Sequence, residues 1–283
     1  MDRHNSYQEM ENHIVDLDAY AGRIGFRGSL RPTKEVLDDL LYHHVSSIPF
    51  ENLDILRGLA IRLDLASLED QLVHKRRGGY CFQQNGLLLG VLRQIGFDVT
   101  PLSARIRLGL ERDQTPPRTH LTLSVRIEGE DWICDAGAGG GSLTSIIRRH
   151  SHEEQMTRHE ARRIVEEGGR FFHQMHSDGG WMDVYEFTGE EMPEIDREVA
   201  NWWTSTSPNA KFAKSLMASR ALPNGERIGL MNDNLTRRQG STVLEKRTIQ
   251  SAAELLKVLR TDFGLDFPEG TRFGSGEKPW PTS

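Results

Sequence analysis

The spacing of apolar residues changes from a helical period to a strand period at Gly96, and this change constrains the fold of the 283-residue chain most strongly. Before Gly96, apolar residues recur three or four positions apart, as in the helix predicted to begin after the N-cap Thr33 and to stop before Pro49. A second helix is expected with Ser67 as its N-cap. Residues 1–95 therefore predict a helical bundle.

Beyond Gly96, short segments alternate between apolar and polar residues and are bounded by glycine or acidic residues. We expect strands over residues 99–110, 120–128, 131–135, 161–165, 171–175 and 181–187. The sequence Glu128-Gly129-Glu130-Asp131 is typical of a turn that joins the second and third of these strands as an antiparallel hairpin. Residues 96–205 therefore predict an antiparallel β-barrel or a strongly bent sheet.

In the last part of the chain, some segments show the helical spacing of apolar residues and others show the strand spacing. We expect a helix over 210–220, short strands over 227–231, 234–236 and 241–244, and a final helix over 252–259 after the N-cap Ser251. The Gly- and Pro-rich tail from Gly270 is expected to lack regular structure. Residues 206–283 therefore predict an α/β lid, and the whole chain predicts an α+β fold whose three parts pack as one unit.

The bulk composition excludes several classes of protein. The net charge of −6, with 37% hydrophobic and 27% charged residues, gives no reason to expect nucleic acid or an anionic membrane as a partner. No apolar run reaches the roughly 18 residues of a membrane helix, and the polar start Met1–Ser6 lacks the apolar centre of a secretion signal. Two cysteines do not make a disulfide framework. We therefore expect a cytoplasmic enzyme.

Cys81 follows a glycine pair and an aromatic residue in Arg77-Gly78-Gly79-Tyr80-Cys81, where an apolar helix is predicted to begin. Unpaired N–H groups and the helix dipole at such a position stabilise a thiolate, which lowers a cysteine pKa from about 8.5 to roughly 3.5–7.5. The glycines allow a tight bend and a close approach of the backbone to a ligand. Because a lone cysteine is more often simply buried, a nucleophile requires partners elsewhere in the chain.

His120 and Asp135 are the candidate partners of this cysteine. A cysteine nucleophile needs a base to take its proton and a third group that orients the base. His120 begins one strand of the predicted hairpin and Asp135 ends the other. Their midpoint lies between Ile127 and Glu128, close to the predicted turn, so the two side chains are expected to be cross-strand neighbours. The sequence therefore predicts a catalytic triad of Cys81, His120 and Asp135.

These motifs resemble those of the arylamine N-acetyltransferases. The resemblance runs from about residue 15 to 215. Its segments, in the family's order, are Pro49-Phe50-Glu51-Asn52, then Arg77 to Cys81, then His120 with Asp135-Ala136-Gly137-Ala138-Gly139, and then Asn201-Trp202-Trp203-Thr204-Ser205-Thr206-Ser207-Pro208.

The resemblance implies a cysteine-protease-like catalytic core and ping-pong acetyl transfer. Cys81 would attack acetyl-CoA as the acyl donor cosubstrate, and an arylamine, arylhydrazine or N-hydroxyarylamine would then take the acetyl group. His120 would act as base and later as proton donor, Asp135 would orient it, and the backbone N–H of Cys81 would stabilise the oxyanion. No metal is implied. The sequence leaves open the natural acceptor, the donor chain length and whether the chain forms a homo-oligomer.

The resemblance also assigns residues around the triad. Arg77 and Glu51 match family positions that form a supporting ion pair, and Asn85 is given a structural role beside them. The glycines after Asp135 would leave room for the arm of CoA. The expected substrate-binding residues are Phe50, Gly137, Ala138 and Gly139.

Ala138 departs from the family pattern, in which this position is usually Phe and lines the acceptor pocket. Loss of the ring weakens stacking on an aryl amine and leaves space for a larger acceptor. Amide synthases that close a macrolactam from a thioester share the fold and the triad, so this activity is an alternative. A binding module for acyl-CoA without catalysis is disfavoured, because all three triad residue types occur at workable spacing.

The glycine-rich segment after Asp135 permits a further interpretation, as the binding loop of an S-adenosylmethionine-dependent methyltransferase. That motif needs a preceding parallel strand and a second strand that ends in an acidic residue about 20 positions on. Glu153 and Glu154 fall near that distance, but no predicted strand leads into them, and the hairpin indicates an antiparallel setting. The methyltransferase is therefore the lower alternative.

Other residues receive structural interpretations. Cys134 precedes Asp135 on a strand, so its side chain should point to the opposite face, into the core. Trp202 and Trp203 are interpreted as core residues, one of which could border the acceptor pocket. Lys211 and Lys214 are interpreted as solvated lysines or contacts for CoA phosphates. The histidines interpreted as solvated or capping residues, and not metal ligands, are His43, His44, His150, His152, His159, His173 and His176.

Overall fold

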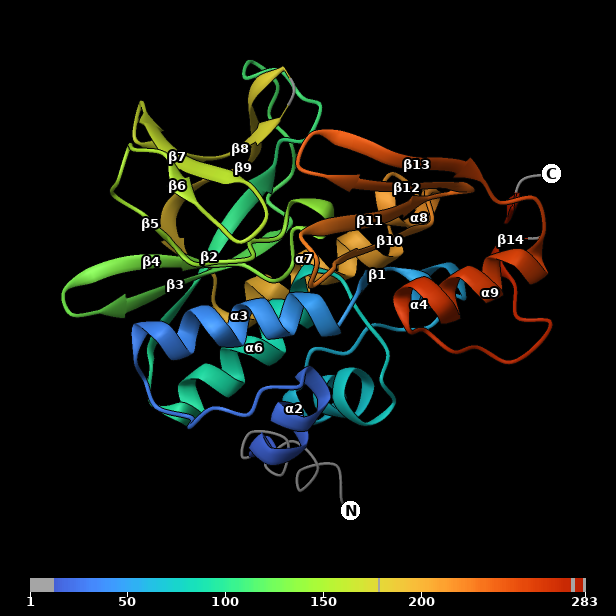
Figure 1. The fold of residues 1–283 in the computed structure, drawn as a ribbon, viewed down its shortest axis with the longest axis horizontal. Coiled ribbons are helices and arrows are strands. Elements are labelled where there is room, and N and C mark those ends of the chain that lie inside the picture. Colours follow the sequence, from blue (N-terminus) through green and yellow to red (C-terminus); the bar gives the residue numbers. More distant parts are fainter. Residues whose placement is uncertain (1–12, 178, 276–277, 282–283) are drawn as a thin grey trace.

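The computed structural model describes residues 13–177, 179–275 and 278–281. In Figure 1 the helices of the first part lie along the lower side, a curled sheet occupies the upper left, and a second sheet with its helix lies on the right. The structure is α+β, as the sequence predicts. The polar segment Met1–Ser6 lies outside the described residues.

The first part of the chain is helical. Its helices are α2 (Leu17–Ile24), α3 (Lys34–Ser47), α4 (Leu53–Leu56), α5 (Leu65–Glu69) and α6 (Cys81–Ile95), with a π-helical turn at Asp70–His74. Thr33 caps α3 as predicted, since its side chain accepts the N–H of Val36 at 3.4 Å. The predicted cap at Ser67 is wrong, because the carboxylate of Asp64 accepts the N–H of Ser67 at 2.9 Å and starts α5 earlier. No helix of the described chain is long and apolar enough to cross a membrane.

An eight-stranded antiparallel sheet follows, in the order β5-β4-β3-β2-β9-β8-β7-β6. It curls into a nearly closed barrel, and its apolar side chains share one core with α3 and α6. Glu128 (φ 50°) and Gly129 (φ 83°) form the tight turn of the predicted hairpin, and positive φ at both positions matches the twist of paired strands. The strands are β2 (Asp98–Ile106), β3 (His120–Ile127), β4 (Glu130–Cys134), β5 (Ile147–Arg148), β6 (Gln155–Met156), β7 (Ala161–Glu167), β8 (Arg170–Ser177) and β9 (Gly180–Glu191).

The terminal sheet has the order β1-β10-β11-β12-β13. Its first strand, β1 (Phe50–Glu51), comes from the helical part and pairs with β10 (Met217–Ala221), so the first and last parts of the chain share one sheet. The remaining strands are β11 (Glu226–Met231), β12 (Asn234–Gln239) and β13 (Thr242–Thr248), and α9 (Ala252–Phe263) packs against the sheet. Ser251 caps α9 as predicted. Domain boundaries at residues 95 and 205 remain a proposal from the sequence.

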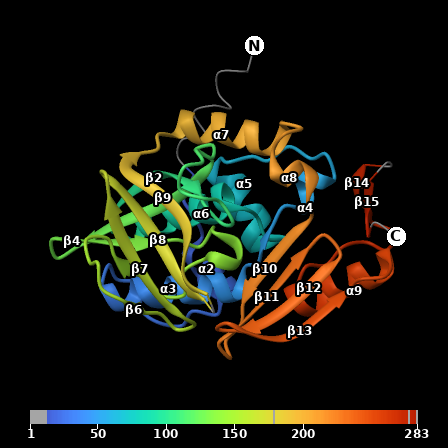
Figure 2. The ribbon, with the colours of Figure 1, turned by 90° about the horizontal axis from the view of Figure 1, so that it is seen from above.

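Two expectations about the second half are wrong, and one helix was not predicted. Residues 194–206, not predicted as a helix, form α7 (Glu194–Thr206), which lies along the upper edge of the molecule in Figure 2. The helix expected over 210–220 is only α8 (Lys211–Lys214), because Met217–Ala221 pairs with strands on both sides and this pairing overrides local helix propensity. The tail forms β14 (Phe273–Ser275) and β15 (Lys278–Trp280), which pair as a short ribbon.

Candidate active site

The loop that presents Cys81 is pressed against neighbouring backbone, and this explains its two glycines. A Cβ at Gly78 would lie 2.1 Å from the carbonyl oxygen of Pro49, and one at Gly79 would lie 2.7 Å from the side chain of Gln83. Any larger residue would push the loop away from β1. Cys81 is the first residue of α6, so its backbone lies at the positive end of a 15-residue helix.

The side chain of Cys81 is buried, with 3% of its surface exposed. Its thiol donates to the carbonyl oxygen of Thr119 at 3.5 Å. Around it lies an apolar cluster that includes Phe50 and Tyr80. The ring of Phe212 completes this cluster, with its centroid 5.9 Å from that of Phe50 and 5.4 Å from that of Tyr80. The nucleophile candidate therefore lies against an aromatic wall built from three separate segments.

His120 and Asp135 meet in the core. Nε2 of His120 lies 2.7 Å from Oδ2 of Asp135, and both side chains are fully buried. The register differs from the expected one, because Leu123 pairs with Cys134 and this alignment places Asp135 opposite Thr122. The imidazole and the carboxylate are thus diagonal neighbours on one face of the hairpin and are not directly opposed.

Asp135 is held by three donors. Its Oδ2 accepts from the imidazole, and its Oδ1 accepts from Nδ2 of Asn85 at 2.9 Å and from the N–H of Gly137 at 2.7 Å. Asn85 also donates to the carbonyl of Leu121 at 2.6 Å, which ties α6 to β3. Burial alone would raise the pKa of Asp135, but these three partners hold it below its ordinary value. The carboxylate is therefore kept ionised and fixed in direction.

The imidazole of His120 is strongly biased towards its protonated form. Burial lowers its pKa, but the Asp135 carboxylate and a hydrogen bond with Cys81 outweigh burial and raise the pKa to about 10. Because Nε2 faces Asp135, Nδ1 is the nitrogen left for the thiol. The ring of Tyr185 packs on the imidazole with centroids 4.9 Å apart. The structure thus brings the side chains of Cys81, His120 and Asp135 together at one place.

Known proteins with a similar sequence decide the family. A model of the N-acetyltransferase family matches residues 33–271. The arylamine N-acetyltransferase of Escherichia coli is 38% identical over 249 residues, which cover 88% of each chain. The chain belongs to the arylamine N-acetyltransferase family. Human arylamine N-acetyltransferase 1 is a more distant member, 30% identical over 89% of this chain and 94% of its own.

Solved structures of arylamine N-acetyltransferases confirm the fold. The enzyme from Salmonella typhimurium superposes with a TM-score of 0.85 at 35% identity, covering 94% of this chain and 96% of the other. The Mycobacterium marinum enzyme in complex with CoA has a TM-score of 0.84 at 35% identity, covering 88% and 92%. The predicted enzyme class, an acyltransferase, and the three-part fold are therefore confirmed.

Of the residues expected to bind substrate, Phe50 and Gly137 lie next to Cys81. Gly137 lies so close to α6 that a Cβ would come within 2.6 Å of Cα of Cys81, so this glycine is required by packing. Gly139 has a φ of +60° and faces the ring of Phe50. Ala138, at the position where the family usually has Phe, is buried. Their contact with a substrate stays a prediction.

The predicted supporting ion pair is present. Nη2 of Arg77 lies 2.6 Å from Oε1 of Glu51, and its Nη1 lies 3.1 Å from Asp54. The guanidinium also packs over the ring of Phe267 at 4.4 Å. Glu51 in turn accepts the N–H of Leu53 at 2.6 Å. Arg77 therefore fixes the glycine loop to β1 and α4, which supports the position of Cys81 without touching it.

Helix α7 contains the first six residues of the motif at 201–208, which the sequence analysis singled out only through the family resemblance. The Asn201 side chain accepts from the Tyr80 hydroxyl and donates to the carbonyl of Ile61 at 3.0 Å, so it anchors the residue next to Cys81. The expectation that Trp202 is a core residue is wrong, because 65% of its surface is exposed. The partly buried Trp203 lines a cavity of about 380 Å³ that also contains Thr119.

A buried ionic cluster that sequence reasoning missed holds the segment after Ala138. Glu160 accepts from Arg162 at 3.0 Å and from Arg227 at 2.6 Å, which joins the barrel to the terminal sheet. Arg162 donates to the carbonyl of Gly141 at 2.9 Å, and Arg227 donates to that of Ser142 at 2.9 Å. Glu160 and Arg227 are 67 positions apart in the sequence, so no local pattern could reveal the cluster.

The histidines were expected to be solvated or capping, and two of them contradict this. His44 is fully buried and bonds the hydroxyl of Tyr20 at 2.8 Å and Oε1 of Gln84 at 2.7 Å. His173 is also fully buried, next to Arg162. His44 lies on the buried face of α3 and His173 among the buried residues of β8, and the polarity of histidine gives no sign of this burial in the sequence. No group of three or more His, Cys, Asp or Glu side chains suited to a metal occurs among the described residues.

Proposed function

We propose that this chain transfers an acetyl group from acetyl-CoA to an arylamine, arylhydrazine or N-hydroxyarylamine by a ping-pong mechanism. The observation that carries the proposal is the connected chain of Cys81, His120 and Asp135 at the start of α6. The names of the relatives and the CoA complex of the Mycobacterium marinum enzyme support the donor and the acceptor class.

In the first half-reaction, the Cys81 sulfur attacks the thioester carbonyl of acetyl-CoA. His120 accepts the proton of the Cys81 thiol as a general base. A tetrahedral intermediate forms, and the bond between the acetyl carbon and the CoA sulfur then breaks. His120 then gives that proton to the departing CoA sulfur, and Cys81 carries the acetyl group as a thioester. The backbone N–H at the start of α6 is the proposed donor to the oxyanion.

In the second half-reaction, the acceptor nitrogen attacks the Cys81 thioester. His120 takes a proton from the nitrogen, the bond between sulfur and the acetyl carbon breaks, and the proton returns to the Cys81 sulfur. Asp135, fixed by Asn85 and Gly137, holds the imidazole in one orientation through both steps. The aromatic wall of Phe50, Tyr80 and Phe212 gives an aryl acceptor rings to pack against.

Neither alternative gains support. The named relatives and structures are arylamine N-acetyltransferases, not macrolactam synthases. The methyltransferase motif needs a parallel strand before its glycines, whereas β4 is antiparallel to both of its neighbours, β3 and β5.

Intact-mass spectrometry after incubation with acetyl-CoA tests the proposal. We expect the chain to gain the mass of one acetyl group, to lose it when an arylamine is added, and to gain nothing in Cys81→Ala. Cys134→Ala is the matched control, because Cys134 is equally buried but lies outside the triad. Acetylation that persists in Cys81→Ala would show that the nucleophile is misassigned.

A further inference from the structure

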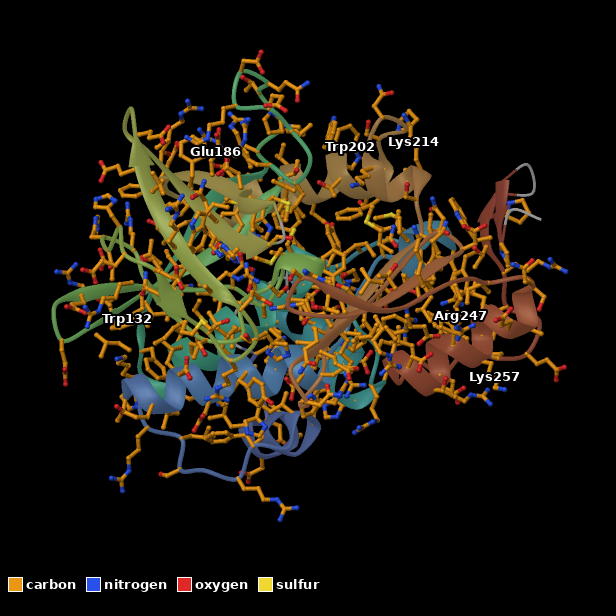
Figure 3. All side chains as sticks on the ribbon, turned by 45° about the horizontal axis from the view of Figure 1, so that its top comes forward. Trp132, Glu186, Trp202, Lys214, Arg247 and Lys257 are labelled. Carbon is orange, nitrogen blue, oxygen red and sulfur yellow. The ribbon has the colours of Figure 1, made fainter. Side chains whose placement is uncertain are left out.

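Helix α7 carries an apolar stripe on its outward face. Ile195, Val199 and Trp202 are 63%, 60% and 65% exposed, and their spacing of four and three positions places them on one side of the helix. Figure 2 shows α7 along the outer edge of the molecule, and Figure 3 shows the side chain of Trp202 directed outward. Elsewhere in the described chain, exposed large apolar residues do not form such a stripe on one helix. A stripe of three marks an interaction surface.

The charges around this stripe are of opposite sign at its two ends. Glu191, the last residue of β9, and Glu194, the first residue of α7, are exposed. Lys211 and Lys214 are exposed just beyond the end of α7, where Figure 3 labels Lys214 next to Trp202. None of these four forms a salt bridge within the described residues. The acidic end makes an anionic lipid surface an unsuitable partner. A partner that fits needs an apolar centre, basic groups opposite the acidic end of this face and acidic groups opposite its basic end.

We propose that this partner is a second copy of the chain, bound through the same face. When two α7 helices lie antiparallel about a two-fold axis between Val199 and Trp202, Val199 packs against Trp202 of the partner subunit and the reverse contact forms at once. The same arrangement brings the acidic start of one helix to the lysines that follow the other. The surface is therefore complementary to itself in its apolar centre and in the charge of its ends.

The size of the contact surface limits the affinity of the proposed dimer. Helix α7 has 13 residues and is about 20 Å long, so the contact falls at the small end of specific interfaces. We therefore expect a reversible dimer that forms at micromolar concentration. The paired face borders the cavity that contains Thr119, since Asp196 and Val199 line that cavity as well.

Sedimentation velocity of the full chain from about 1 to 100 µM tests the dimer. Wild type should shift from 32.1 kDa towards twice that mass, and Trp202→Glu should stay monomeric throughout. Met156→Glu is the matched control, because Met156 is 75% exposed but lies on another element, and this variant should dimerise like wild type. Thermal unfolding of each variant verifies that it is folded.

A charge exchange tests the orientation of the pair. Lys211→Glu with Lys214→Glu should weaken the dimer at least tenfold, and adding Glu191→Lys with Glu194→Lys should restore it. A wild-type chain that is monomeric at every concentration overturns the proposal, as does a dimer that Trp202→Glu leaves intact. Trp202-dependent binding to phosphatidylcholine vesicles by a monomeric wild type would assign the face to a lipid surface instead, which also overturns it.

Discussion

Replacing Asp135 by Asn tests the electrostatic basis of the triad. In the wild type, Oδ2 of Asp135 lies 2.7 Å from Nε2 of His120, and this carboxylate, together with a hydrogen bond with Cys81, raises the pKa of the imidazole to about 10. The distance from the ordinary value of 6.5 corresponds to about 5 kcal/mol in favour of the protonated ring. An amide is nearly isosteric but neutral, and its NH₂ facing Nε2 would favour the tautomer that carries its proton on Nδ1. That tautomer cannot take a proton from Cys81.

The loss of the negative charge at residue 135 should change both the catalytic activity and the pH dependence of stability. We expect the rate of Cys81 acetylation in Asp135→Asn to fall by roughly 10³- to 10⁴-fold. A group whose folded pKa is raised stabilises the fold below its unfolded pKa, and this stabilisation is lost as pH rises through the folded value. The unfolding free energy of wild type should therefore decline between pH 6.5 and about 10 through His120, and this decline should be absent in Asp135→Asn.

Urea unfolding across that pH range and stopped-flow acetylation measure the two effects. Asp131→Asn is the matched control, since Asp131 lies on β4, the strand that Asp135 follows, but its side chain pairs only with surface groups. Its acetylation rate and its pH dependence of unfolding should match those of wild type. If Asp135→Asn acetylates within tenfold of wild type and keeps the wild-type pH dependence, the carboxylate does not control His120 and the reasoning is refuted.

Two further substitutions test the pocket and the buried cluster. Ala138→Phe adds a ring at the residue that follows Gly137, which packs against Cys81. The kcat/KM for two-ring acceptors should therefore fall at least tenfold relative to one-ring acceptors; an unchanged ratio would place Ala138 outside the acceptor site. Glu160→Gln leaves Arg162 and Arg227 without their carboxylate and should cost about 3–5 kcal/mol of unfolding free energy in urea. Glu245→Gln is its control, because the Glu245 side chain is 40% exposed and its ion pair with Arg247 lies at the surface. Its loss should be below about 1 kcal/mol, and equal losses in the two would contradict a buried ionic cluster.

Local chemistry explains why much of the fold was predictable. The cap at Thr33, the glycine turn at 128–129 and the change of period at Gly96 are short-range signals, and each appears where the sequence predicts it. The helix expected over 210–220 is wrong because strand pairing from distant segments decided that region. Helix α7 was not predicted, although Pro193 at its start and the acidic residues Glu194 and Asp196 in its first turn are typical signals of a helix N-terminus.

The sequence by itself determined the residue types of the site and their order, because a nucleophile, a base and an orienting carboxylate must be present in any fold that performs this chemistry. It also predicted that His120 and Asp135 meet, since a hairpin brings its two ends together. Only the tertiary structure decided that they meet diagonally, that Phe212 closes the aromatic wall, and that Glu160 joins two sheets. These contacts join residues far apart in the chain, and long-range packing leaves no periodic trace in a single sequence.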